Sequence, residues 1–315
     1  MGEIHKLLSE HGKAKVLQLG LEFERPVIDA AANYLGNDDT EIAFLYSGWA
    51  QAALPHKRLP DDASWQIRTD YLTLIVQPGV RSNETGAPTH VGVPYGSRAR
   101  LIFIYLQSEA LKNNSCEIEL GKTLREWLRR LGIPIGGKSV EAVREQAERI
   151  SRCNMTFEMR RGDRSGLVNQ HILDTAMFVS DPAGVGRGQF LERATLSARF
   201  FEQLKRHPVP IEEAAISAIA NNSLAIDIYC WLAYRLHSLD KATMISWRAL
   251  HMQFGANTSS LKYFKHNFRR PLEIALSVYP DAKVDYEDQG LKLHPSRPPV
   301  SPKIVALATK HVTKA

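Results

Sequence analysis

The segment Thr258–Arg270 reads TSSLKYFKHNFRR and decides how the rest of the chain is interpreted. Its spacing predicts a helix from Thr258 to Tyr279 with one buried apolar stripe, formed by Leu261, Phe264, Phe268 and Leu272. The opposite face has hydroxyl, amide, imidazole and basic groups and no acid: Ser259, Tyr263, His266 and Arg270, with Lys262, Lys265, Asn267 and Arg269 towards its flanks. Such groups bond phosphates, and Arg, Lys or Asn read base edges. We expect this face to contact DNA, the alternative being a solvated basic helix face.

The flanking segments predict that this helix is the second helix of a helix-turn-helix and that a wing follows it. A long helix, Ile211–Leu236, broken or bent near Asn221-Asn222, comes first, and a helix from Thr243 to Phe254 ends at Gly255. After Pro280, a hairpin is predicted from Lys283–Tyr286, Asp288-Gln289-Gly290 and Leu291–His294. We therefore expect a winged-helix domain over residues 191–296. Lys292 in its wing and Arg297 just beyond it are assigned to DNA binding as well.

A similar order of segments earlier in the chain predicts a first winged-helix domain over residues 91–190. Its expected helices are Arg98–Leu111, Thr123–Leu131 and Ser139–Arg152, with a short strand at Glu117–Leu120. The strands Asn154–Arg160 and Leu167–Val179 are expected to form a hairpin through residues 161–166.

Basic groups in this first domain are further candidates for DNA contacts. Lys138 and Ser139 lie at a predicted helix N-terminus, which can hold a phosphate. Three arginines lie at the wing turn, where they either contact DNA or form an ordinary basic surface turn: Arg160, Arg161 and Arg164. The helix Ser139–Arg152 presents glutamates outward, and acids repel phosphates. We expect this domain to be a poorer reader of bases and a better candidate for self-association.

Residues Gly132–Ser139 read GIPIGGKS and match the P-loop pattern. A P-loop follows a buried strand, whereas Thr123–Leu131 predicts an amphipathic helix. The glycine-rich residues 184–188 likewise lack the strand and helix of a dinucleotide site and predict a linker. We expect no nucleotide or other cofactor to bind.

No catalytic or metal site emerges from the sequence. The histidines lack His-x-His and His-x-x-x-His spacing, and the cysteines lie far apart at Cys116, Cys153 and Cys230. Tyr229 and Tyr234 resemble candidate nucleophiles, but they belong to an apolar helix in which packing is the expected role. The sequence therefore predicts a protein that is not an enzyme.

Length and charge suit a multidomain protein that binds a polyanion. The 315 residues have a net charge of +6, and residues 199–315 hold 16 Lys and Arg against 10 Asp and Glu. No membrane span or secretory signal is found, which predicts a cytoplasmic protein. We expect an α+β, predominantly helical chain in four parts: an irregular α/β region (1–90), two tandem winged-helix domains (91–190 and 191–296) and a flexible tail (297–315).

Several longer motifs resemble those of the RepA-type plasmid replication initiators. They are FLYSG at 44–48 with ALPH at 53–56, PYGSRARL at 94–101, Leu131-Gly132 with Gly136-Gly137, AIDIYCWL at 225–232, and Ser246-Trp247 with Gln253-Phe254-Gly255. The resemblance implies binding of double-stranded DNA at plasmid origin repeats, local duplex opening, a homodimer in one state, and recruitment of a host initiator protein and the replicative helicase. A winged-helix transcriptional regulator and a nicking or nucleotide-hydrolysing replication enzyme are the alternatives.

Overall fold

The computed structural model describes residues 2–19, 23–37, 41–70, 72–82, 86–120, 129, 133, 137–161, 164–180, 189–256, 258 and 260–301. These residues form helices and antiparallel sheets, so the fold is α+β as expected. The described residues form two compact units. We call Tyr46–Pro208 the inserted unit, and the residues up to Leu45 together with those from Val209 onwards the discontinuous unit.

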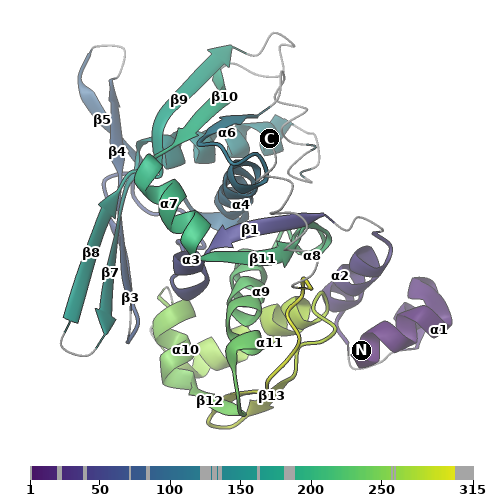
Figure 1. Ribbon diagram of the computed structural model, residues 1–315. Coiled ribbons are helices and arrows are strands. Elements are labelled where there is room, and N and C mark those ends of the chain that lie inside the picture. The colour runs from purple at the N-terminus through teal and green to yellow at the C-terminus, as the bar shows by residue number, and fades with distance from the viewer. Residues whose placement is uncertain are drawn as a thin grey trace. The chain divides into compact units, whose positions relative to one another are not determined.

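The chain passes from one unit to the other through a single pair of strands, β1 (Ile42–Tyr46) and β11 (Pro208–Glu212), seen in Figure 1. The backbone N–H of Glu213 donates to the Glu41 carbonyl (3.1 Å), and that of Ser47 donates to the His207 carbonyl (3.0 Å), so the strands run antiparallel. Both ends of the inserted unit therefore lie side by side. These units divide the chain differently from the expected boundaries at residues 90, 190 and 296, because a pairing between distant segments leaves no local signal.

The discontinuous unit is mainly helical and contains one three-stranded antiparallel sheet of order β12-β14-β13. Besides β1 and β11 it comprises α1 (Glu3–Gln18), α2 (Arg25–Leu35), α8 (Glu213–Ala218), α9 (Ser223–Arg235), the 3-10 helix η1 (Leu236–Ser238), β12 (Thr243–Ser246), α10 (Trp247–Phe254), α11 (Leu261–Leu276), β13 (Val284–Glu287) and β14 (Gly290–Leu293). Helices α9, α10 and α11 enclose a core rich in aromatic side chains: Tyr229, Trp231, Trp247, Phe254, Phe264 and Phe268.

Two predicted helices of this unit are partly wrong. The helix Ile211–Leu236 is broken near Asn221-Asn222 as expected, where Asn222 starts α9 by accepting a hydrogen bond from the Ala225 N–H (3.0 Å). Its start is wrong, because residues 211–212 belong to β11, whose prolines favour extended backbone. The segment Thr243–Phe254 begins as strand β12. Its helix, α10, starts only at Trp247, because the Ser246 hydroxyl caps it by accepting from the Ala249 N–H (3.2 Å).

The inserted unit contains a four-stranded sheet of order β2-β3-β7-β8, a three-stranded sheet of order β6-β10-β9, and the hairpin β4-β5. Its elements are α3 (Ser47–Gln51), β2 (Trp65–Arg68), β3 (Leu72–Gln77), β4 (Gly79–Ser82), β5 (Pro88–Gly92), α4 (Gly96–Lys112), β6 (Glu117–Glu119), α6 (Gly137–Arg152), β7 (Asn154–Arg161), β8 (Arg164–Gln170), β9 (Leu173–Ser180), β10 (Gln189–Leu196) and α7 (Ala198–Arg206). Helix α6 buries the apolar face that its spacing predicted: Val140, Val143, Ala147 and Ile150. Although α4 is buried along most of its length, no helix among the described residues is long and apolar enough to cross a membrane.

The predicted strand Leu167–Val179 is two strands that belong to different sheets. Strand β8 pairs with β7, whereas β9 pairs with β10. Between them the chain is held at buried Ile172, whose carbonyl accepts from the Ser197 N–H (2.9 Å). The predicted hairpin with the three wing arginines is confirmed as β7-β8 of the four-stranded sheet, but its second strand ends at Gln170 rather than Val179. Apart from Arg129, the predicted helix Thr123–Leu131 lies outside the described residues, as does the predicted linker 181–188.

Candidate nucleic-acid interface

An aromatic cluster holds α11 in place. Phe264 and Phe268 are buried, as the helical spacing predicted. The Trp247 ring lies edge-on to both, with its centroid 6.5 Å from that of Phe264 and 6.0 Å from that of Phe268. The Phe254 ring approaches Phe268 to 5.6 Å. Because these rings fix the rotation of α11 about its axis, they also decide which side chains turn outward.

The first half of α11 presents an exposed face without acids. Lys262, Tyr263 and His266 are exposed, Tyr263 to 68%. Within the described part of the chain none of these three side chains has a hydrogen bond or an ion pair, and α11 has no carboxylate before Glu273. Leu261, which we expected to be buried, is 40% exposed because it is the first residue of the helix. Ser259 lies outside the described residues.

Lys265, predicted on the flank of this face, points to the hairpin β13-β14 instead. Its Nζ donates to the carbonyl of Asp288 (3.0 Å) and lies 5.6 Å from the centroid of Trp247. The Tyr286 hydroxyl in turn donates to the Lys265 carbonyl (3.2 Å). Lys265 therefore links α11 to the hairpin and is not part of the exposed face.

The two basic residues assigned to the wing do not join this face either. Lys292 alternates with buried Leu291 and Leu293 along β14, so it points to the other side of the sheet, where its Nζ lies 3.9 Å from Glu287 Oε1. Arg297 is exposed after the sheet, and its carbonyl accepts from the Tyr279 hydroxyl (2.7 Å). The hairpin turn itself bears the acids Glu287 and Asp288.

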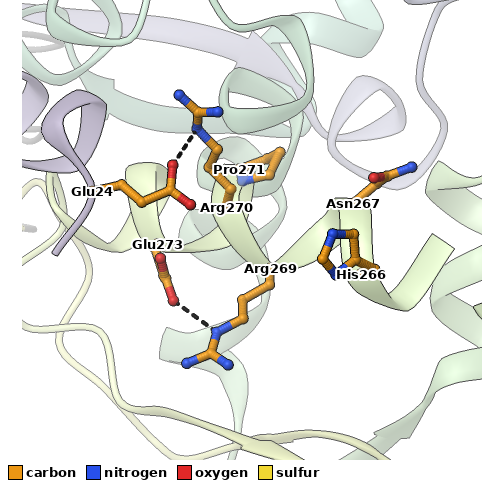
Figure 2. A pocket seen from close by; sticks show the side chains of 7 residues that line it. All are labelled: Glu24, His266, Asn267, Arg269, Arg270, Pro271 and Glu273. Carbon is orange, nitrogen blue, oxygen red and sulfur yellow. Dashed lines mark hydrogen bonds and ion pairs between the residues drawn. The ribbon is translucent and has the colours of Figure 1, made fainter. Parts of the chain in front are cut away.

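The second half of α11 carries two arginines that pair with carboxylates. Arg269 donates from Nε to Glu273 Oε1, one turn later (3.0 Å), and its Cζ lies 5.7 Å from the centroid of Tyr286. Arg270 Nε lies 2.9 Å from Oε2 of Glu24, the residue that immediately precedes α2. Figure 2 shows both pairs at a surface hollow of about 530 Å³. The sequence analysis missed Glu24, because no local pattern marks a partner so distant along the chain.

Pro271 lies inside α11 beside this hollow, which His266 and Asn267 also line. Proline has no backbone N–H, so it cannot donate to the carbonyl of Asn267 as another residue would. Around this point α11 changes its surroundings, since α2 packs against it and the buried His5 ring contacts the carbonyl of Ser277 (Nε2 to O 2.8 Å). The acid-free exposed face in the first half of α11 thus lies N-terminal to the part of the helix that α2 contacts.

In the inserted unit, α6 is packed on the side where the sequence placed outward glutamates. Glu145 accepts from Arg149 Nη2 (2.9 Å), and Glu148 accepts from Arg81 of β4 (3.1 Å). Buried Arg149 also donates to Asp61 Oδ1 (2.8 Å). Hydrogen bonds from Arg149 and Arg58 outweigh the desolvation that opposes them and lower the pKa of Asp61 below its usual range. This face of α6 is therefore a packing surface.

The remaining predicted contacts in the inserted unit lie at two separate places. Lys138 is exposed and Ser139 half-buried in the first turn of α6, and most of the P-loop-like segment before them lies outside the described residues. Arg160, Arg161 and Arg164 lie at the end of the β7-β8 hairpin, where Arg161 is opposite Arg164. The structure does not bring these five residues into one cluster.

The polar groups buried near α9 form a hydrogen-bonded core. The Tyr229 oxygen accepts from the Glu212 N–H (3.2 Å), and burial raises the pKa of Tyr229 well above its usual value. The Tyr34 hydroxyl donates to Glu212 Oε2 (2.7 Å), and burial raises the pKa of this carboxyl. A buried, protonated Tyr229 is poorly suited to attack DNA. Among the described residues, no group of three or more His, Cys, Asp or Glu side chains could hold a metal ion.

One solved structure shares this fold. A crystal structure of selenomethionine derivatives of domains 2 and 3 of RctB matches with a TM-score of 0.52 and 12% identity, over 82% of this chain and 99% of that one. A second crystal structure, of RctB domains 2–3, gives a TM-score of 0.43 and 11% identity over 78% of this chain and 93% of that one. No curated protein matches the sequence.

The family comparison concerns the middle of the chain. Residues 93–249, which run from just before α4 into α10, match the family described as plasmid-encoded RepA protein. The chain is therefore a plasmid replication protein. It belongs to the RepA-type plasmid replication initiators, which confirms the resemblance found in the sequence.

Proposed function

We propose that this protein is a non-enzymatic initiator, working without a cofactor, that binds double-stranded DNA at repeated sites of a plasmid origin. Its family membership supports origin binding. The observation that carries the DNA contact is the first half of α11, where Lys262, Tyr263 and His266 are exposed and no carboxylate lies among them. Such a face suits the phosphates and base edges of a duplex and has no evident role in packing.

The order of elements supports a winged helix around α11. Helix α9, strand β12, helices α10 and α11, and the hairpin β13-β14 follow one another, with the last strand in the middle of the sheet. In this architecture the second helix of the helix-turn-helix, here α11, enters the major groove. We assign the contact to α11 rather than to the wing, because Glu287 and Asp288 at the wing turn would repel phosphates.

The packing of α2 decides how far α11 enters the groove. Helix α2 contacts α11, and the residue before α2 pairs with Arg270. A helix with its side chains is about 10 to 12 Å across and the major groove is about 12 Å wide, so α2 cannot enter beside α11. We therefore assign base edges and adjacent phosphates to Lys262, Tyr263 and His266. Arg270, which the sequence suggested as a reader of bases, is assigned to the groove edge together with Arg269.

For the inserted unit we propose a role in homodimer formation. Its sheet β6-β10-β9 has the same strand order as β12-β14-β13, which supports a second winged helix interrupted by β7 and β8. The face of α6 that would enter a groove is engaged by Arg81 and Asp61. Duplex opening and recruitment of a host initiator and the replicative helicase are part of this proposal through the family alone.

The test is competition binding of the full-length protein to the DNA that flanks its own gene, at several salt concentrations. Lys262→Ala should weaken binding and lower the slope of log affinity against log salt by about one unit, because one phosphate contact is lost. Lys283→Ala is the matched control. It removes the same charge at the far end of the sheet, where Val284 pairs with Leu293, away from the turn that contacts Lys265.

Unchanged binding in folded Lys262→Ala protein, or an equal loss in both variants, would contradict the assignment to α11. Maintenance of a plasmid that carries the origin separates an initiator from a transcriptional regulator, and only an initiator should support it. Nicked DNA or ATP turnover by the purified protein would instead establish the enzymatic alternative.

A further inference from the structure

Glu24 is a carboxylate that another part of the chain brings to the helix that we assign to DNA. It precedes α2, and its Oε2 lies 2.9 Å from Nε of Arg270, with both side chains 53% exposed. The other acid of the hollow, Glu273, belongs to α11 itself and pairs with Arg269. In Figure 2, Glu24 approaches Arg270 from the side opposite to His266 and Asn267. Arg270 is thus occupied by a partner that DNA would have to displace.

The position of Glu24 is fixed by folded structure. Its carbonyl accepts from the N–H groups of Val27 and Ile28 in the first turn of α2, at 2.9 and 3.3 Å. Helix α2 packs against α1, α8 and α11, and the buried contact of His5 with the Ser277 carbonyl holds α1 to the end of α11. Glu24 is therefore presented to α11 by a packed element at an almost constant place.

An exposed ion pair of this kind adds little to stability, on the order of 0 to 1 kcal/mol, because water and salt screen it. The ion pair matters more for the binding of a polyanion than for the stability of the fold. A phosphate that reaches Arg270 either displaces Glu24 from Nε or binds the other N–H groups of the guanidinium beside a carboxylate, where like charges repel, so both routes cost free energy. Only a duplex whose bound geometry brings a phosphate at the groove edge to the right distance from Arg270 recovers this cost.

We propose that Glu24 is a specificity-determining residue of DNA binding: by holding Arg270, it weakens binding to arbitrary DNA more than binding to the correct site. The proposal rests on the proposed function, in which α11 contacts the duplex. Sequence-independent affinity comes mainly from phosphate contacts. Keeping one arginine paired therefore lowers the affinity for the many non-specific sites that compete in a genome.

The experiment compares full-length wild-type and Glu24→Gln proteins on two duplexes of equal length. One carries the sequence that flanks the gene, and the other carries the same bases in shuffled order. Glu24→Gln should bind the shuffled duplex about 3- to 10-fold more tightly, with a salt slope steeper by up to about one unit, since one more arginine is free for a phosphate. Affinity for the flanking duplex should change less than about 2-fold, so the ratio of the two affinities falls.

Three further variants make the test specific. Asp29→Asn removes a carboxylate from the same helix, but Asp29 pairs with Lys13 (2.8 Å), so the affinity ratio should stay at the wild-type value. In an Arg270→Ala background, Glu24→Gln should have no effect on either duplex. Lys262→Ala is measured in the same assay and tests whether α11 contacts the duplex.

The outcomes separate the two proposals. If Lys262→Ala weakens binding while Glu24→Gln leaves the ratio unchanged, Glu24 has no such role and the function of α11 stands. If Glu24→Gln and Asp29→Asn raise binding to shuffled DNA equally, the effect is one of net charge and the inference is wrong. If the wild-type protein binds neither duplex, the proposed function fails, and the inference fails with it.

Discussion

Arg149 is a buried charge whose hydrogen bonds join three segments of the inserted unit. Its guanidinium donates to Asp61 (2.8 Å), to Glu145 (2.9 Å) and to the carbonyl of Val93 (3.1 Å), and its Cζ lies 5.2 Å from the centroid of Tyr95. All of these partners lose their donor together if the side chain is removed.

Arg149→Ala should therefore lower the free energy of unfolding by about 2 to 4 kcal/mol, because the carbonyl of buried Val93 loses the guanidinium as its donor and, of the described basic side chains, Asp61 and Glu145 keep only Arg58 as a neighbour. Urea denaturation measures the change. Arg152→Ala is the control on the same helix, since its ion pair with Glu148 is more exposed and should cost less than about 1 kcal/mol. Equal losses in the two variants would show that Arg149 acts only as surface charge.

Helical spacing predicted which residues of α11 are buried, but it did not predict the interaction partners of its basic side chains. Phe264, Phe268 and Leu272 are buried as expected, because periodicity reports the direction of a side chain. Lys265 donates to the carbonyl of Asp288 and Arg270 pairs with Glu24, and both partners lie outside α11. Spacing carries no information about such partners.

At the scale of elements, the aromatic cluster sets both the stability of α11 and the direction of its exposed face. Phe268→Ala should lower the free energy of unfolding by about 3 to 5 kcal/mol, since a fully buried ring between Trp247, Phe254 and Phe264 is lost. Thermal and urea unfolding of the full-length protein measure this cost.

Tyr263→Ala, on the same helix, is the control for Phe268→Ala. Because Tyr263 is exposed, stability should change by less than about 0.5 kcal/mol while affinity for the flanking duplex falls. A destabilised Tyr263→Ala protein, or a Phe268→Ala protein as stable as the wild type, would place the anchor of α11 elsewhere.

Element boundaries were predicted where a local residue marks them. Gly255 ends α10, and the hairpin after Pro280 lies where its turn residues indicated. The strand β12 and the break between β8 and β9 were missed, because they depend on strand partners elsewhere in the chain. Capping by Ser246 was available in the sequence and would have placed the start of α10 correctly.

At the scale of the whole molecule, the division into two units makes a prediction about fragments. Residues 46–208 should fold alone and unfold cooperatively in urea, because this unit has its own sheets and its two ends are joined by the hydrogen bond from the Ser47 N–H to the His207 carbonyl. The fragment 191–315 should not, since it cuts into β10, whose partners β6 and β9 it lacks, and it is missing α1, α2 and β1. Circular dichroism and urea denaturation of both fragments measure whether each one is folded. A folded 191–315 with an unfolded 46–208 would contradict the division.

The sequence indicated two modules in tandem because order along the chain is all that local patterns reveal. The pairing of β1 with β11 joins segments on either side of the inserted unit, and neither segment carries a local signal that identifies its partner. Family resemblance was the stronger guide at this scale, since its motifs extended across both units and were confirmed over residues 93–249.

Because the chain leaves the discontinuous unit at β1 and returns to it at β11, its two units can fold only in a certain order during synthesis. Helices α1 and α2 and strand β1 leave the exit tunnel first, yet their partners α8, α11 and β11 lie beyond the inserted unit. At about 5 to 20 residues per second, the nascent chain waits on the order of ten to thirty seconds for them, long enough for residues 46–208 to fold first. During that interval Val27, Ile28 and the apolar residues of β1 are uncovered, so this initiator should depend on chaperones early in its synthesis, before the helix that we propose to contact DNA has been made.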